Sequence, residues 1–132
     1  MTSYIEELYK NLKKVKKERP SVVSLFSGCG GLDFTFHKAG YKHLWANDFD
    51  SFSTQSFKNN ISKCMLAGSI EDLDLDVIPK ADVVLGGFPC QDFSQIWKKP
   101  GLDGTRGNLY TYFVDVVKRT KPKFFIAENV KG

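Results

Sequence analysis

Short apolar runs and amphipathic runs take turns along this chain, and together they predict an alternation of strands and helices. Runs rich in Val, Ile, Leu and Phe predict five strands, at residues 21–26, 42–48, 64–68, 81–87 and 123–129. Helical or polar patterns between them predict three helices. One runs from the glycine turn SGCGG at residues 27–31 to Gly40, one covers 51–60 and one covers 107–120. Strands that alternate with helices indicate an α/β fold with a parallel sheet and right-handed crossovers.

The first twenty residues follow a different pattern. Ser3 and Glu6 have the spacing of a capping box, and Pro20 stops the helical pattern that follows them. Apolar residues recur at helical spacing at Ile5, Leu8, Tyr9, Leu12 and Val15. We therefore expect a basic amphipathic helix within residues 1–20, separate from a domain over residues 21–132. Its lysine-rich face is either simply solvated or contacts phosphates.

Composition limits the class of protein. A chain of 132 residues is long enough for one domain, and its net charge of +4 permits nucleic-acid binding without establishing it. No apolar run approaches the ~18 residues of a membrane span, and the start MTSYIEELYK does not resemble a signal peptide. We therefore expect a cytoplasmic protein. Three cysteines without C-x-x-C spacing indicate neither a disulfide framework nor a zinc site, so we expect no metal.

A glycine turn, LFSGCGGLD, joins the first strand to the first helix and places glycines at 28, 30 and 31. Glycine allows a tight turn and lets a ligand approach the main chain. No Gly-Lys-Ser/Thr follows, so the turn is not a phosphate-binding P-loop. The dinucleotide pattern G-x-G-x-x-G fails as well, because Asp33 stands where its third glycine would be.

A carboxylate at the end of the second strand suggests what the turn binds. Asp48 follows Gly28 by twenty residues, and a carboxylate at this place can accept hydrogen bonds from both ribose hydroxyls. Phe26 and Phe49 flank the same pocket and can hold a flat base between them. A cofactor with ribose and adenine but no pyrophosphate fits, and S-adenosylmethionine is such a cofactor. A purely structural turn with an exposed Asp is the alternative.

The segment GGFPCQDFS places a thiol at the carboxyl end of the fourth strand. Open α/β sheets bind ligands at this edge, and Cys90 there has Pro89 to fix its backbone and Gln91 and Ser94 as polar neighbours. Glu128 ends the next strand, so a nucleophile and an acid can converge on one pocket. Taken singly, Cys90 could be inert packing and Glu128 a charge that caps a helix.

We interpret the other two cysteines and both histidines as structural residues. Cys64 is interpreted as packing, and by residue type Cys29 is interpreted in the same way. His37 and His43 have no evident partners and are interpreted as surface or strand-start residues. Residues 91–105 fit neither period, and a segment of this length is typical of a functional lid or a disordered stretch.

Five segments in order carry a resemblance to a known family: LFSGCGGLD, WANDFD, GGFPCQDFS, GLDGTRGNLY and FFIAENVKG. Over about residues 21–132 the chain resembles the amino-terminal half of a DNA cytosine-5 methyltransferase. The resemblance implies a Rossmann-like, S-adenosylmethionine-dependent methyltransferase fold. It implies a parallel sheet in the order 3-2-1-4-5 that is incomplete at its carboxyl-terminal edge, and a partial catalytic domain.

The resemblance also implies a mechanism and a set of residues. Cys90 would add to C6 of a flipped cytosine, Glu128 would contact the base edge, and C5 would take the methyl group of S-adenosylmethionine. Other positions that match the catalytic pocket are Pro89, Gln91, Ser94, Arg106 and Asn129. Positions that match the cofactor site are Phe26, Ser27, Gly28, Cys29, Gly30, Gly31, Asp48, Phe49, Ser69, Ile70 and Leu109.

Two departures from the family pattern affect the expected partners. Ser69 stands where the family commonly has an Asp that contacts the adenine amino group. The sequence also stops at Gly132, before the family's later basic motif, target-recognition domain and final helix. The resemblance implies double-stranded DNA as substrate, in a restriction-modification system. Because of the second departure, we also expect a second polypeptide that carries the remainder, or self-association. A silent fragment that binds only cofactor or a partner, and a tRNA cytosine methyltransferase, are the alternatives.

Overall fold

A five-stranded parallel sheet organises the chain, with strand order β3-β2-β1-β4-β5. The computed structural model describes residues 6, 19–88 and 109–129. The predicted amino-terminal helix lies almost wholly outside the described residues. The strands are β1 (Ser21–Leu25), β2 (Lys42–Asp48), β3 (Met65–Ala67), β4 (Val83–Gly87) and β5 (Phe124–Glu128). The helices are α2 (Gly31–Lys38), α3 (Ser51–Asn60), α5 (Leu109–Thr120) and the short 3-10 helices η1 (Ile70–Asp72) and η2 (Leu75–Val77).

The expected α/β fold class and strand order are therefore confirmed. β1 lies at the centre, paired with β2 on one side and β4 on the other. Because every pair is parallel, the carboxyl ends of all the strands meet at one edge of the sheet. The turns that follow β1, β2 and β4 leave from this edge, which brings distant parts of the sequence together there.

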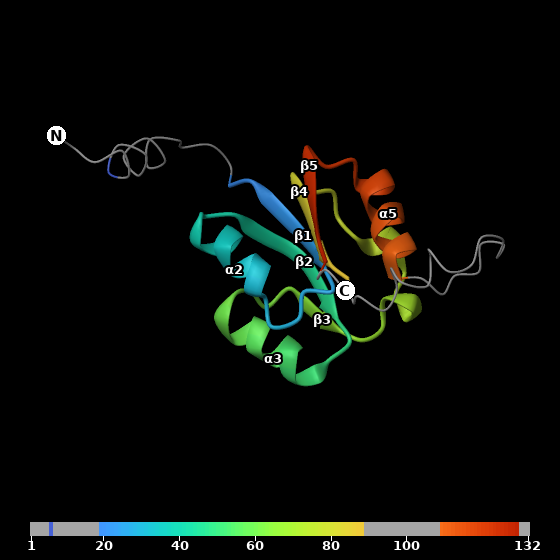
Figure 1. Cartoon of the computed structure of the whole chain (residues 1–132), viewed down its shortest axis with the longest axis horizontal. Coiled ribbons are helices and arrows are strands. Elements are labelled where there is room, and N and C mark those ends of the chain that lie inside the picture. Colours follow the sequence, from blue (N-terminus) through green and yellow to red (C-terminus); the bar gives the residue numbers. More distant parts are fainter. Residues whose placement is uncertain (1–5, 7–18, 89–108, 130–132) are drawn as a thin grey trace.

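Helices cover both faces of the sheet (Figure 1). α2 and α3 lie on one face, and α5 lies on the other together with η1 and η2. Alternation along β1 explains this arrangement, since Val22 packs toward α2 whereas Val23 and Leu25 pack toward α5. No helix in the described part of the chain is long and apolar enough to cross a membrane.

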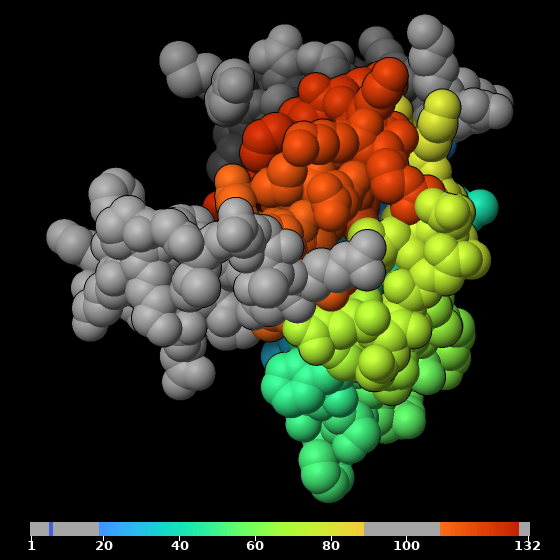
Figure 2. Space-filling view, turned by 90° about the vertical axis from the view of Figure 1, so that its right-hand side faces the viewer, coloured from blue at the N-terminus to red at the C-terminus, as the bar shows by residue number. Residues whose placement is uncertain are grey.

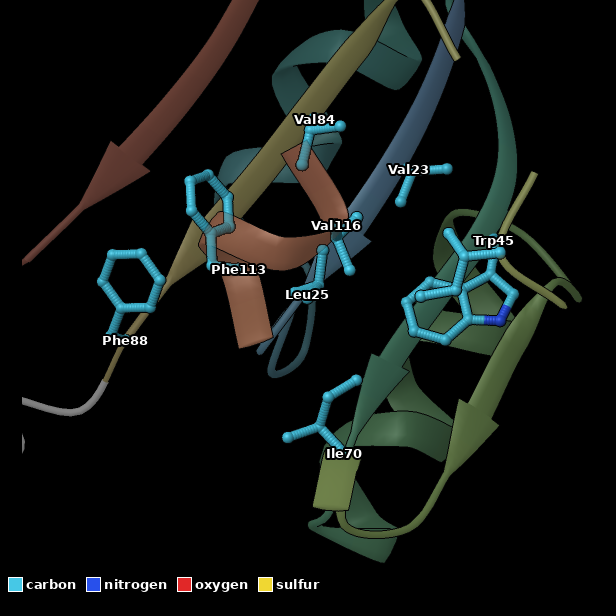
Figure 3. Packing of buried hydrophobic residues seen from close by; sticks show 9 residues of the cluster. Val23, Leu25, Trp45, Ile70, Val84, Phe88, Phe113 and Val116 are labelled. Carbon is cyan, nitrogen blue, oxygen red and sulfur yellow. The ribbon is translucent and has the colours of Figure 1, made fainter. Parts of the chain in front are cut away.

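The larger core cluster lies beneath α5 (Figure 3). Phe88 and Phe113 meet edge to face there, with ring centroids 5.0 Å apart, and Trp45 and Ile70 extend the cluster toward β2 and η1. In the space-filling view, α5 lies across this face next to the segment that contains η1 and η2 (Figure 2). Phe88 directly follows β4, so the core is continuous with the edge where β4 leads into Cys90.

Candidate functional site

Two neighbouring cavities lie at the carboxyl edge of the sheet. The first has a volume of about 150 Å³ and is lined by Phe26, Asn47, Phe49, Gly68, Ser69, Ile70 and Leu109. The second has a volume of about 240 Å³ and is lined by Ser24, Leu25, Phe26, Ser27, Gly31, Leu32, Asp33, Gly86, Gly87 and Glu128. Phe26 lines both cavities, so they are adjacent sites at the end of the central strand.

Two aromatic residues dominate the first cavity. Phe26 has a φ of 53°, a left-handed conformation that is uncommon for a bulky residue. Such strain is often found at ligand sites, where the surrounding structure holds it in place. Phe49 is 73% exposed although it is aromatic. Both residues line the first cavity, and stacking of a flat base between them stays a prediction.

Asp48 organises the glycine turn directly. One carboxylate oxygen accepts from the Gly28 N–H at 2.8 Å, and the other accepts from the Asp50 N–H at 2.9 Å. Each carboxylate oxygen has a second lone pair, so these bonds leave capacity for the ribose hydroxyls. Asp50 in turn caps α3 by accepting from the Ser53 N–H. Hydrogen bonding from the Ser53 side chain, together with that from its backbone N–H, lowers the pKa of Asp50.

The glycines of the turn have unequal surroundings. Gly30 is buried, and a Cβ added there would lie 2.1 Å from Cδ1 of Ile61 and 2.8 Å from Cδ2 of Phe57. No heavy atom lies within 4 Å of a Cβ built at Gly28 or Gly31. Gly30 therefore allows α3 to pack against the turn, while the other two glycines leave space open.

Asn47 and Gly68 line the first cavity and were not predicted as site residues. The Asn47 side-chain amide donates to the carbonyls of Leu66 and Gly68, both at 3.0 Å, and so fixes the turn after β3. Ser69 caps η1, where its hydroxyl accepts from the Glu71 N–H at 3.3 Å. That N–H bond occupies one acceptor site of the hydroxyl, which can still face a ligand. The contact expected between Ser69 and adenine stays a prediction.

Glu128 contributes an acid to the second cavity. It ends β5 beside Gly87 of β4, and its side chain is exposed. A Cβ built at Gly87 would lie 3.4 Å from Oε2 of Glu128, so the carboxylate extends over the end of β4. Asn129 follows directly and is exposed. The acid is thus close to the end of the strand that leads into Cys90.

Several predicted residues cannot be placed. Pro89, Cys90, Gln91, Ser94 and Arg106 lie outside the described residues, as does the whole segment 91–105. Their catalytic roles stay predictions.

The remaining cysteines differ from each other. Cys64 is half-buried beside the cluster under α3, and burial raises the pKa of its thiol, which agrees with a packing role. Cys29 is exposed in the glycine turn and is not in the lining of either cavity. Its expected place in the cofactor site stays a prediction.

His43 corrects one interpretation from the sequence. It is 7% exposed, and its Nε2 lies 2.9 Å from Oδ1 of Asp33, which is 1% exposed. His43 does lie at the start of β2, but it is a buried residue with a partner and not a surface residue. Sequence alone held no signal for this pair, because the contact depends on how α2 sits over the first residues of β2.

Comparison with known proteins gives one family. The family model described as C-5 cytosine-specific DNA methylase matches residues 21–132. The type II methyltransferase M.NgoFVII of Neisseria gonorrhoeae is 55% identical over 116 residues, which are 86% of this chain and 31% of that protein. The type II methyltransferase M.NgoPII of the same organism is 41% identical over 113 residues, which are 84% of this chain and 33% of that protein. The chain thus spans about a third of the length of these relatives.

Solved structures agree on the fold. A prophage-encoded protein of E. coli, assigned as a DNA modification methyltransferase, matches with a TM-score of 0.65 and 28% identity. The match covers 86% of this chain and 32% of that chain. The Dnmt2 methyltransferase of S. pombe matches with a TM-score of 0.58 and 17% identity, over 86% of this chain and 37% of that one.

Proposed function

Because the chain belongs to the family of C-5 cytosine-specific DNA methylases, we propose that it provides the cofactor and catalytic part of an enzyme that methylates C5 of cytosine in DNA. The type II methyltransferases among its relatives support a place in a restriction-modification system. The observation that carries the proposal is the junction of the two cavities at Phe26, with Glu128 at one and the exposed ring of Phe49 at the other.

The residues present fit S-adenosylmethionine. Phe26 and Phe49 suit the adenine and Asp48 suits the ribose. Among the described residues, no Lys or Arg lines either cavity to attract phosphate. When bound, the cofactor supplies an electrophilic methyl group. In this proposal the chain's own residues hold the nucleoside in the first cavity and leave the second for the charged end of the cofactor and the reacting edge of the base.

The chemistry at the base is assigned to two residues. The Cys90 thiolate forms a bond to C6 of a flipped cytosine, which makes C5 a nucleophile that takes the methyl group. Glu128 contacts the edge of the base and stabilises the adduct. Loss of the C5 proton and breaking of the sulfur–C6 bond then release the methylated base and restore the thiolate.

We also propose that the complete activity uses polypeptide that pairs with β5. β5 is an edge strand of the sheet, and Phe124 and Phe125 on it are 43% and 55% exposed. Edge strands with apolar residues favour pairing with more chain. A second polypeptide paired there would carry the part that reads the DNA sequence. Self-association of the protein through β5 is the alternative.

Methyl transfer from labelled S-adenosylmethionine to duplex DNA tests the function. The full chain should be assayed alone and together with the remainder of M.NgoFVII that lies outside the matched stretch. We expect transfer in the mixture and its loss in Cys90→Ala, since no other residue is assigned as nucleophile. Glu128→Gln should lower the rate on the order of a hundredfold or more. Cys64→Ala is the matched control and should retain transfer, because Cys64 packs under α3.

Each proposal has an outcome that contradicts it. Undiminished turnover in Cys90→Ala would remove the nucleophile assignment. Labelling of tRNA in preference to duplex DNA would favour an RNA substrate. Cofactor binding without transfer to either nucleic acid, in every mixture, would indicate a catalytically silent binding protein.

A further inference from the structure

Basic side chains gather at the edge of the sheet where the strands begin, which we call the amino edge. Every Lys and Arg in the described part of the chain lies in the last turn of a helix or in the segment that leads into a strand. Because all the strands are parallel, the helices between them bring the chain back to the strand starts. These cations therefore lie toward the edge that is opposite the arrowheads of the strands in Figure 1.

Helix ends explain only part of this arrangement. The helix dipole favours a cation in the last turn of a helix, which accounts for Lys38, Lys58 and Lys118. It does not account for the exposed cations that precede or begin a strand and lie outside the helices. We call these residues the edge cations: Arg19, Lys42, Lys63, Lys80 and Lys121.

The acids near these strand starts are already paired with other cations. Asp82 precedes β4, and its carboxylate lies 2.7 Å from Nζ of Lys123. Asp76 of η2 lies 2.9 Å from a guanidinium nitrogen of Arg119. None of the edge cations forms an ion pair with another residue that the structure describes. Their charges are therefore available to a partner from outside.

The carboxyl edge, where the candidate site lies, has the opposite charge. Asp48 and Asp50 follow β2, Glu71 and Asp72 belong to η1 after β3, and Glu128 ends β5. Over residues 19–88 and 109–129, no Lys or Arg lies at this edge to offset them. The field of the described residues thus attracts a polyanion to the amino edge and not to the candidate site.

The dimensions of the amino edge suit the backbone of a nucleic acid. Neighbouring strands lie about 4.8 Å apart, so the starts of the five strands span about 19 Å. Duplex DNA has one negative charge for about every 1.7 Å of its axis, so a duplex along this edge presents several phosphates to it. A strand of five residues, such as β1 or β4, separates the two edges by about 16 Å. Contact at the amino edge is therefore distinct from contact at the candidate site.

We propose that the amino edge is a second DNA-binding surface, where the edge cations contact the sugar–phosphate backbone of duplex DNA without reading its sequence. Duplex DNA is the partner because the chain belongs to a family of DNA methylases and the cations form an extended row. This surface goes beyond the proposed methyl transfer and does not depend on it. Contacts of this kind hold a protein on DNA and let it slide, while the candidate site engages another stretch.

The salt dependence of DNA binding counts the phosphate contacts. Binding of the full chain to a labelled duplex should be followed by fluorescence anisotropy between 50 and 200 mM salt. Each lost contact lowers the slope of log affinity against log salt by about 0.9, so Lys42→Gln with Lys80→Gln should lower it by about 2. The loss of affinity over this range should then be about tenfold smaller than in the unaltered chain. A duplex of unrelated sequence should give the same values.

A matched pair of substitutions separates local contacts from net charge. Phe52→Glu with Gln55→Glu changes the charge by the same amount in the first half of α3, where both residues are exposed, and should leave the slope unchanged. Circular dichroism should show that both double variants keep the fold of the unaltered chain, since none of the four residues lines either cavity.

Several results would overturn the inference. They are no binding of duplex DNA by the unaltered chain at 50 mM salt, an unchanged slope in the lysine variant, and an equal reduction in the α3 variant. Tighter binding of polyglutamate than of DNA would indicate an acidic polypeptide as the partner instead. A failure of methyl transfer with the slope difference intact would refute the proposed function alone.

Discussion

Glycines that look equivalent in the sequence have different roles in the structure. Gly30 has a φ of 92° and no room for a Cβ, because Ile61 and Phe57 of the α3 layer press against it. Gly40, at the end of the α2 region, has nearly the same φ of 89°, but a Cβ placed there would have no heavy atom within 4 Å. A substitution at Gly40 therefore adds backbone strain alone, whereas one at Gly30 adds both backbone strain and overpacking.

Gly30→Ala should destabilise the protein more than Gly40→Ala. Left-handed strain alone costs about 1–2 kcal/mol, and overpacking at Gly30 raises the expected loss to about 2–5 kcal/mol. Denaturant unfolding followed by circular dichroism measures both losses in free energy. Equal losses in the two variants would show that α3 moves aside at no cost, contrary to the packing described for Gly30.

Residue patterns could predict which strand ends meet at one edge of the sheet but not which side chains bond to each other there. Phe26 and Phe49, which both line the first cavity, could be predicted as neighbours because strand ends in a parallel sheet share one edge. The pair of Asp33 and His43 was missed, since it depends on the seating of α2 and on the irregular register of β1 and β2 between Val22 and Val23. Burial of a histidine is decided by such packing and leaves no periodic signal.

At the scale of elements, periodicity was informative wherever a run was long enough. β2 and α3 occupy the predicted spans, 42–48 and 51–60, and β5 lies within its predicted range. The short helices η1 and η2 were not predicted. Each has three residues and depends on one capping side chain, from Ser69 and Asp74, so no hydrophobic period marks it. η1 nevertheless places Ile70 in the core and Ser69 at the first cavity.

Asp82 joins the starts of three strands at the edge opposite the site. Asp82 directly precedes β4, and one of its carboxylate oxygens accepts from the N–H and the hydroxyl of Ser21, the first residue of β1. Its other oxygen lies 2.7 Å from Nζ of Lys123, which directly precedes β5. The Lys123 ammonium and the Ser21 donors lower the pKa of Asp82 from 3.8 to about 2, and the carboxylate raises the pKa of Lys123. The carboxylate form therefore stabilises the folded state.

Asp82→Asn should change how stability depends on acid pH. A lowered folded pKa gives stability that is present above pH 3.8 and lost as the pH falls toward about 2. The difference in unfolding free energy between the unaltered protein and Asp82→Asn should therefore narrow over this window. Urea unfolding at several pH values measures it. Asp115→Asn is the control, because Asp115 is exposed on α5 and forms no ion pair within the described residues. Identical pH profiles for both variants would contradict this role of Asp82.

At the scale of the whole molecule, β5 is the least protected part of the sheet. Ile126 packs with the cluster under α2, and Phe125 meets Phe113 of α5 at 5.9 Å between ring centroids. Phe124 and Phe125 still expose about half of their surface. The division into an amino-terminal helix and a catalytic domain, and the cytoplasmic location, stay predictions. The exposed edge itself can be tested directly.

In isolation the protein should self-associate through β5. Pairing of two edges would satisfy free backbone groups and bury the phenylalanine rings, whereas a lysine at an edge opposes such pairing. Phe124→Lys should therefore shift the mass measured by sedimentation toward the monomer. Phe52→Lys is the matched control, since Phe52 is 86% exposed on α3, across the sheet from β5. If β5 pairs with additional polypeptide in the working enzyme, adding that polypeptide should also dissociate the self-associated form. A monomer at all concentrations, or an equal effect of Phe52→Lys, would mean that β5 does not drive association.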